Sequence, residues 1–242
     1  MMLNRILNRV RETQWQFKRT GSTVRICRGA QFVCGRNVTI RNSDIWVAPG
    51  SKLLLGDNVV IQDITMELNG VCTFESDVKI IGNSQHDRSV YLIQDGHVYI
   101  SNHALIDCQR VWLRFGGKLY IGEYTNINHG SEIRSDENVT IGSYNQISYN
   151  VRIWDTNTHA ILPPAERRLA TQRDWPFIGK EHERPATRPV VIGDDCWLGE
   201  RVSILKGTTI NNEVIIGYNT TIVGKVIPEG KKVVADLGIR IM

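Results

Sequence analysis

The sequence predicts an all-β protein built as a parallel β-helix, and three observations carry this prediction. An aliphatic residue returns at every sixth position over residues 192–222. Gly, Asn and Asp recur between these aliphatic residues, as tight turns require. Helical periodicity is absent after residue 20. A six-residue period fits neither an α-helix nor a plain strand, so it indicates a short strand and a turn, repeated three times in a coil of about 18 residues.

Residues 1–20 are expected to form a short capping helix over one end of the coils. Leu3, Ile6, Leu7 and Val10 fall on one helical face, and three arginines lie elsewhere. An alternative is a helix that rests on an anionic membrane surface, at the inner face of the cytoplasmic membrane. This segment lacks the uninterrupted apolar core and cleavage site of a secretory signal, so we expect none.

Residues 21–242 are expected to form one β-helix domain, with aliphatic side chains six residues apart stacked in its interior. The series comprises Ile192, Leu198, Ile204, Ile210, Ile216 and Ile222, then Ile121, Ile127 and Ile133, then Ile141, Ile147 and Ile153, and more weakly Leu55, Ile61, Phe74 and Ile80. A β-sandwich of short strands would not keep one phase over so long a stretch. With coils about 4.8 Å apart, roughly eight to ten coils would form a prism some 40–50 Å long.

Two segments interrupt this pattern. Residues 85–97 are expected to form a longer excursion. Residues 160–189 are expected to form an inserted loop, which is rich in proline and arginine and carries Trp175. Long loops on a repeat scaffold are usually functional or disordered. Because this loop directly follows His159, we expect it to be functional.

The composition excludes several classes of protein. The 29 Lys and Arg residues against 25 Asp and Glu residues give a net charge of only +4, which does not indicate a nucleic-acid-binding surface. No apolar run reaches the roughly 18 residues of a membrane span. The five cysteines are odd in number and form no CxxC pair, so neither a disulfide framework nor a zinc ribbon is expected. These features favour a soluble, cytoplasmic protein.

Two motifs flank the inserted loop. Val151-Arg-Ile-Trp-Asp-Thr-Asn-Thr-His159 precedes it, and Pro189-Val-Val-Ile-Gly-Asp-Asp-Cys-Trp197-Leu-Gly199 follows it. Together with the repeats, they resemble the hexapeptide-repeat acyltransferases, most closely the bacterial O-acetyltransferases of sugars and surface polysaccharides. The resemblance covers residues from about 120 to 242. It implies a left-handed parallel β-helix, acetyl-CoA as acyl donor, no metal, and a homotrimer with active sites between neighbouring prisms.

The same resemblance implies the residues of the site. His159 falls on the family's catalytic base, and Trp197 falls on a tryptophan that lines the acceptor or acetyl site. Asn128 falls where galactoside-type members carry an active-site asparagine. Asp155 or Asn157 is expected to hold the other ring nitrogen of His159, and a backbone carbonyl is the alternative. These side chains and Trp175 make up the predicted acceptor site.

The last coils depart from the family pattern in the segments that contact CoA. The candidate CoA-binding residues are Lys206, Gly207, Gly217, Gly224, Lys225 and Arg240. The positive charges of Lys206, Lys225 and Arg240 could contact the phosphates of CoA, or these residues could form a solvated basic face. The arginines of the inserted loop would suit an acidic sugar as acceptor.

Acetyl transfer to a sugar hydroxyl needs a base, and a neutral imidazole near pH 7 fits this role. No cysteine lies in a recognisable nucleophile setting, so we expect direct transfer in a ternary complex. Three alternatives stay open. The acceptor could be the amine of an amino sugar, the chain could be a non-enzymatic scaffold, or His97 and His103 could belong to a zinc-dependent carbonic anhydrase site.

Overall fold

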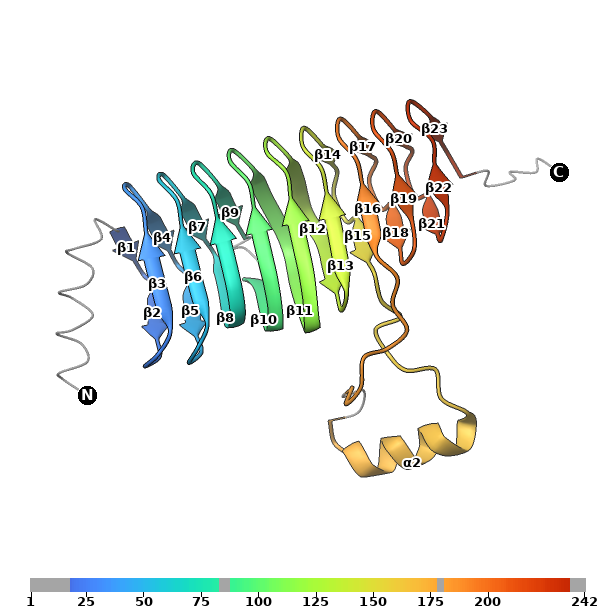
Figure 1. The fold of residues 1–242 in the computed structure, drawn as a ribbon, viewed down its shortest axis with the longest axis horizontal. Coiled ribbons are helices and arrows are strands. Elements are labelled where there is room, and N and C mark those ends of the chain that lie inside the picture. Colours follow the sequence, from blue (N-terminus) through green and yellow to red (C-terminus); the bar gives the residue numbers. More distant parts are fainter. Residues whose placement is uncertain (1–17, 83–87, 178–180, 236–242) are drawn as a thin grey trace.

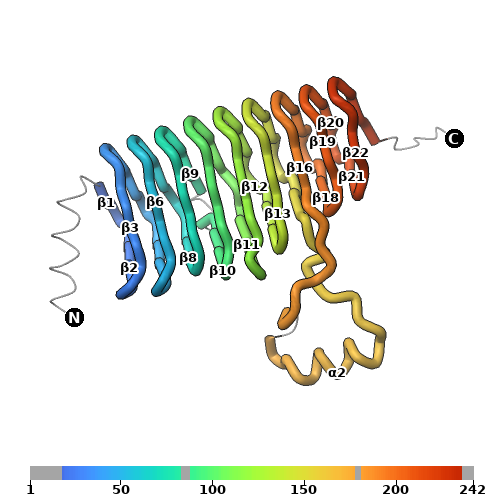
Figure 2. The backbone as a smooth tube through the Cα atoms, viewed as in Figure 1, coloured from blue at the N-terminus to red at the C-terminus, as the bar shows by residue number. Residues whose placement is uncertain are grey.

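The computed structural model describes residues 18–82, 88–177 and 181–235. These residues form a parallel β-helix, in which the strands stack in consecutive coils (Figure 1). Strand β1 and strand β22 lie at opposite ends of the stack (Figure 2). The predicted fold class, a left-handed β-helix of hexapeptide repeats, is confirmed.

The coils have three faces, and every strand pairs in parallel with the strand of the next coil. The first face contains β1 (Lys18–Thr20), β4 (Thr39–Arg41), β7 (Val60–Gln62), β9 (Lys79–Ile81), β14 (Gln146–Ile147), β17 (Trp197–Leu198), β20 (Ile215–Ile216) and β23 (Lys232–Val233). The second face contains β2 (Thr23–Ile26), β5 (Asp44–Val47), β15 (Arg152–Trp154), β18 (Ser203–Leu205) and β21 (Thr221–Val223). The third face contains β3 (Gln31–Cys34), β6 (Lys52–Leu55), β13 (Asn138–Ile141), β16 (Val190–Ile192), β19 (Thr209–Ile210) and β22 (Val226–Ile227).

Four long strands in the middle of the stack continue around the corners between faces. They are β8 (Ile64–Phe74), β10 (Ser89–Ile100), β11 (Leu105–Ile121) and β12 (Asn126–Ser135). Strand β10 corrects one expectation, because residues 89–97 were assigned to an excursion and instead pair with β8 and β11. Glycines and residues with positive φ, such as Asp95 and Phe115, let these strands bend at the corners.

The coil length also differs from the expectation of about 18 residues throughout. That length holds after the insertion, where Asp194 bonds to Asn212, 18 residues later. In the first coils Arg36 bonds to Asp57, 21 residues later. The longer coils add residues to their outward positions and corners, so the interior stacking is kept while the six-residue period is lost.

The interior consists of the predicted aliphatic stacks. Ile121, Ile127, Ile133, Ile204 and Ile210 are all inaccessible to solvent, and the buried core runs without a break from Val24 to Ile222. Burial of each such side chain contributes about 1.5–3 kcal/mol. This continuous core makes the prism a rigid support for the groups at its corners.

The described residues outside the prism belong to the insertion, which leaves the corner between the second and third faces. It begins after β15, ends before β16, and carries helix α2 (Pro164–Asp174), which projects from the stack (Figure 1). A bridge between Thr156 and Thr187 joins its two ends. The sequence predicted a loop here and missed this helix. In the described part of the chain, no helix is long and apolar enough to cross a membrane.

The predicted cap over residues 1–20 lies mostly outside the described residues. Residues 18–20, which were assigned to the cap, form strand β1 and pair with β4. The β-helix therefore begins at residue 18 or earlier.

Candidate active site

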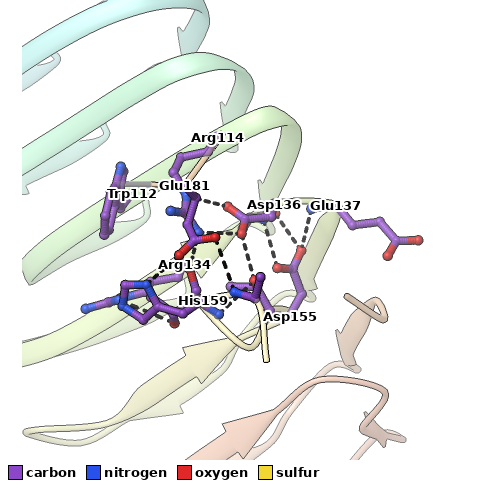
Figure 3. Close-up of polar contacts among 12 residues, drawn as sticks. Trp112, Arg114, Arg134, Asp136, Glu137, Asp155, His159 and Glu181 are labelled. Atoms are coloured by element: carbon purple, nitrogen blue, oxygen red, sulfur yellow. Dashed lines mark hydrogen bonds and ion pairs between the residues drawn. The ribbon is translucent and has the colours of Figure 1, made fainter. Parts of the chain in front are cut away.

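His159 stands at the start of the insertion, five residues after the end of β15 (Figure 3). Its imidazole is 57% exposed. The preceding residue, Thr158, has a φ of 71°, in the left-handed region that a β-branched residue rarely adopts. A residue whose backbone is held in such a conformation must be fixed by its surroundings.

A buried network fixes Thr158. Arg114 donates two hydrogen bonds to the Asp136 carboxylate, at 2.9 and 2.7 Å, and a third to the carbonyl oxygen of Thr158 at 3.0 Å. The hydroxyl of Thr156 donates to Asp136 and accepts from the amide of Thr158. Arg114 and Asp136 are nearly inaccessible to solvent, so this bidentate ion pair is strongly directional. It ties the start of the insertion to the two preceding coils.

An arginine and two tryptophans lie beside this network on the second face. The guanidinium of Arg134 lies between the rings of Trp112 and Trp154, at 5.2 and 4.5 Å from their centroids. It also reaches the hydroxyl of Thr158 at 3.4 Å. These cation–π contacts hold Arg134 against the corner that carries His159.

Asp155 does not contact His159, although the sequence suggested it as the partner of the ring. It is fully buried, and its carboxylate accepts hydrogen bonds from the amides of Asp136, Glu137 and Asn138 and from the hydroxyl of Ser135. Burial raises the pKa of this carboxyl, and the four hydrogen bonds oppose that rise. Asp155 therefore closes the corner and cannot reach a substrate.

The partner of His159 is Glu181, which the sequence did not single out. Its Oε1 lies 2.7 Å from the Nδ1 of His159, and its Oε2 accepts from the amide of Ala160 at 3.2 Å. Asn157, the other predicted partner, donates its backbone amide to Ala186 and has no side-chain contact with His159. No pattern in the sequence links positions 159 and 181, because the insertion has no repeat.

His159 and Glu181 line a cavity of about 460 Å³ between the ends of the insertion and helix α2. The other lining residues are Ala160, Leu162, Arg167, Ala170, Thr171, Arg173, Asp174, His182 and Glu183. Arg173 is paired with Asp174, and His182 bonds to the same carboxylate at 3.3 Å. The charge of Arg173 is thus balanced by Asp174, and Arg167 lies in the same wall.

The other predicted acceptor residues lie elsewhere in the protomer. Trp197 is on β17 of the first face, is 53% exposed, and has Gln146 and Ile215 as register partners. Asn128 lies on the same side, where its side chain donates to the carbonyl oxygen of Ile147. Trp175 follows α2 and is 72% exposed. Asn128 and Trp197 thus lie on the same side of the prism with β14 between them, on a face that His159 does not adjoin.

Four of the six candidate CoA-binding residues share the corner that carries the insertion. Lys206 and Gly207 follow β18, and Gly224 and Lys225 follow β21. The Nζ of Lys206 lies 3.5 Å from the carbonyl oxygen of Ala186, at the foot of the insertion. Gly217 lies at a different corner, after β20. Arg240 lies outside the described residues.

Among the described residues, no three His, Cys, Asp or Glu side chains are grouped as metal ligands. The Nδ1 of His103 lies 3.9 Å from a carboxylate oxygen of Asp77, and its ring stacks on Tyr124 at 4.6 Å between centroids, away from the insertion. His97 lies within β10.

Comparison with known proteins links this fold to a class of transferases. Residues 189–224 match the model of the bacterial transferase hexapeptide, six repeats. Over 113 residues, the chain is 34% identical to a protein of Escherichia coli K12 named putative lipopolysaccharide biosynthesis O-acetyl transferase WbbJ, an alignment that covers 47% of this chain and 54% of that protein. The chain spans about half the length of the curated relatives it matches.

Two solved structures are similar at lower identity. The polySia-specific acetyltransferase NeuO aligns with a TM-score of 0.48 and 19% identity, over 91% of this chain and 82% of that one. The acetyltransferase VCA0836 of Vibrio cholerae, solved with acetyl coenzyme A, aligns with a TM-score of 0.43 and 21% identity, over 59% and 67%. The resemblance stated from the sequence is confirmed: residues 189–224, which match the bacterial transferase hexapeptide model, contain all six of the strictly spaced aliphatic positions from Ile192 to Ile222.

Proposed function

We propose that this chain is an O-acetyltransferase that moves an acetyl group from acetyl-CoA to a saccharide hydroxyl in surface polysaccharide synthesis. The observation that carries the proposal is His159, an exposed imidazole on the wall of a cavity at the corner of hexapeptide coils. The name of the Escherichia coli relative, a lipopolysaccharide biosynthesis O-acetyl transferase, supports the reaction and the class of acceptor.

In the proposed mechanism His159 accepts the proton of the acceptor hydroxyl as that oxygen attacks the thioester carbonyl carbon. The bond from carbon to sulfur then breaks, and His159 returns the proton to the leaving thiolate. A thiol with a pKa near 8.5 is a tolerable leaving group, so no acid stronger than the imidazolium is required. Lys206 and Lys225, at the same corner, would supply ammonium groups to the phosphates of the donor.

We also propose that the active unit is a homotrimer with sites between neighbouring prisms. Trp197 and Asn128 lie on a face that is separate from the His159 corner, so they can join one acceptor site only if another copy supplies them. Mixed trimers test this. His159→Ala and Trp197→Ala subunits, each inactive alone, should regain part of the activity after unfolding and refolding together. If the refolded mixture has no more activity than the two variants measured separately and added, the result would contradict active sites shared between subunits.

Light scattering of the intact protein should give three times the chain mass of 27.4 kDa. A monomer mass together with full activity would exclude the shared site. A cytoplasmic location, with contact of the first residues with the inner membrane face, is a further proposal that rests on the sequence.

The proposed reaction is tested by calorimetry with acetyl-CoA, using wild type and His159→Ala in parallel. We expect both to bind with similar affinity in the micromolar range, because His159 acts on the acceptor. Only the wild type should release CoA when saccharide acceptors are added. Absence of binding by the wild type, with and without acceptor, would contradict the proposal and favour a scaffold role.

A further inference from the structure

Glu181 makes a two-point contact with the segment that carries His159. Its carboxylate holds the imidazole Nδ1 with one oxygen, at 2.7 Å, and the amide of Ala160 with the other, at 3.2 Å. The Glu181 side chain is only 12% exposed, whereas that of His159 is 57% exposed. A shielded carboxylate therefore lies behind an imidazole that faces open space.

This contact determines which ring nitrogen can act as a base. An ionised carboxylate only accepts hydrogen bonds, so the proton of the neutral ring must be on Nδ1. The lone pair is then on Nε2, the nitrogen that Glu181 does not hold.

The other charged groups around this cavity are already engaged or lie apart from the ring. Arg173 and His182 both bond to Asp174. Arg167 and Glu183 line the cavity and form no ion pair with the His159 ring. Asp136 is paired with Arg114, and Asp155 is bound by backbone amides. Among the described residues, Glu181 is the carboxylate that contacts the His159 ring.

We propose that Glu181 is the positioning residue of the catalytic base: it fixes the Nδ1–H tautomer of His159 and orients the ring, so that Nε2 faces the cavity side as the proton acceptor. This inference rests on the proposed function of His159. It also gives the insertion a role, because residues 159 and 181 are 22 positions apart and lie on its outgoing and returning segments.

The first test is spectroscopic and needs no substrate. Nitrogen-15 spectra of the histidine rings, with the His159 signal identified from its loss in His159→Ala, should give the Nδ1–H tautomer in the wild type. In Glu181→Gln the ring should become a mixture of tautomers, because the amide can either donate to Nδ1 or accept from it. An Nε2–H tautomer in the wild type, or identical spectra in the variant, would overturn the proposal.

The second test is kinetic. Glu181→Gln should lower kcat by about 10–100-fold near pH 7, as loss of a hydrogen-bonded partner behind a functional histidine typically does. Binding of acetyl-CoA, measured by calorimetry, and the unfolding temperature should stay close to those of the wild type.

Glu166→Gln is the matched control, because Glu166 lies on helix α2 of the same insertion and is not among the residues that line the cavity. It should keep the kcat and the pH profile of the wild type. Wild-type kinetics in Glu181→Gln, with His159→Ala inactive, would overturn the role of Glu181 alone. Full activity of His159→Ala would overturn the proposed function as well.

Discussion

At the scale of single residues, Asp155 and Glu181 show why two carboxylates near one histidine have different roles. Asp155 is four positions from His159 in the sequence, yet its carboxylate turns inward to the amides of the previous coil. Glu181 is distant in sequence and reaches the imidazole. Proximity along the chain favours Asp155, but the corner needs an acceptor for its buried donors, and this need determines where Asp155 points.

Asp155→Asn should therefore affect stability and leave the pH dependence of kcat intact. An amide keeps one acceptor oxygen and places a donor against donors, so we expect the free energy of unfolding to fall by about 1–3 kcal/mol. Denaturant unfolding measures the loss, and the kcat profile of the same variant supplies the control. A shifted acid limb without loss of stability would indicate that Asp155, and not Glu181, acts on His159.

The raised pKa of Asp155 predicts how the stability loss of Asp155→Asn depends on pH. Burial raises its pKa above the usual 3.8, so the folded protein binds this proton more tightly than the unfolded chain does. The stability that the more tightly bound proton contributes is fully present below pH 3.8 and is lost as the pH rises through the raised pKa. The asparagine variant lacks the titration, so its deficit relative to the wild type should be larger at pH 4 than at pH 7.

At the scale of elements, helix α2 was missed because it buries none of its residues. Without a buried face there is no apolar stripe, which is the signal that predicts helices in a sequence. Weaker signals were present: a proline at its first position, Glu166 in the first turn and Arg173 in the last. The helix therefore forms through local helix preference, and its residues form one wall of the cavity. None of its residues is buried against the prism.

Such a helix should open easily, and limited proteolysis tests this. We expect trypsin to cut first after Arg167, Arg168 or Arg173, all of them exposed, before it cuts the coils. The two fragments should remain associated under native conditions, because β15 before the cut pairs with β18 after it, and β13 pairs with β16. Mass spectrometry locates the cut, and gel filtration reports association. First cleavage within residues 39–147, or separation of the fragments, would contradict this view.

At the scale of the whole molecule, the sequence predicted the architecture better than its dimensions. In the coils after the insertion the strands are two or three residues long, so Ile204 and Ile210 report a six-residue period directly. In the first coils, where Arg36 reaches Asp57, extra residues lie at outward and corner positions, and the period is lost without any change to the interior. The motif before the insertion identified His159. The contact of Glu181 with His159 depends on how the non-repetitive insertion folds, and no sequence pattern predicted it.

The five cysteines give a test that covers the whole length of the prism and the direct-transfer mechanism together. Cys72, Cys108 and Cys196 are buried, and Cys27 and Cys34 are half-buried. Burial raises the pKa of Cys34 to about 11 and raises the pKa values of Cys72, Cys108 and Cys196 as well. Thiolates are the reactive form, so at pH 8 only about one Cys34 in a thousand is ready to react.

We therefore expect a disulfide reagent at pH 8 to modify Cys27 first, Cys34 slowly, and the other three only after unfolding in guanidinium. The Cys27→Ser variant should lack the first phase. Since no cysteine lies in the insertion, modification of the native protein should leave acetyl transfer intact. Rapid reaction of more than two thiols would contradict the continuous core. Loss of activity in step with one thiol would instead indicate an acyl-cysteine route, because direct transfer uses no thiol of the protein.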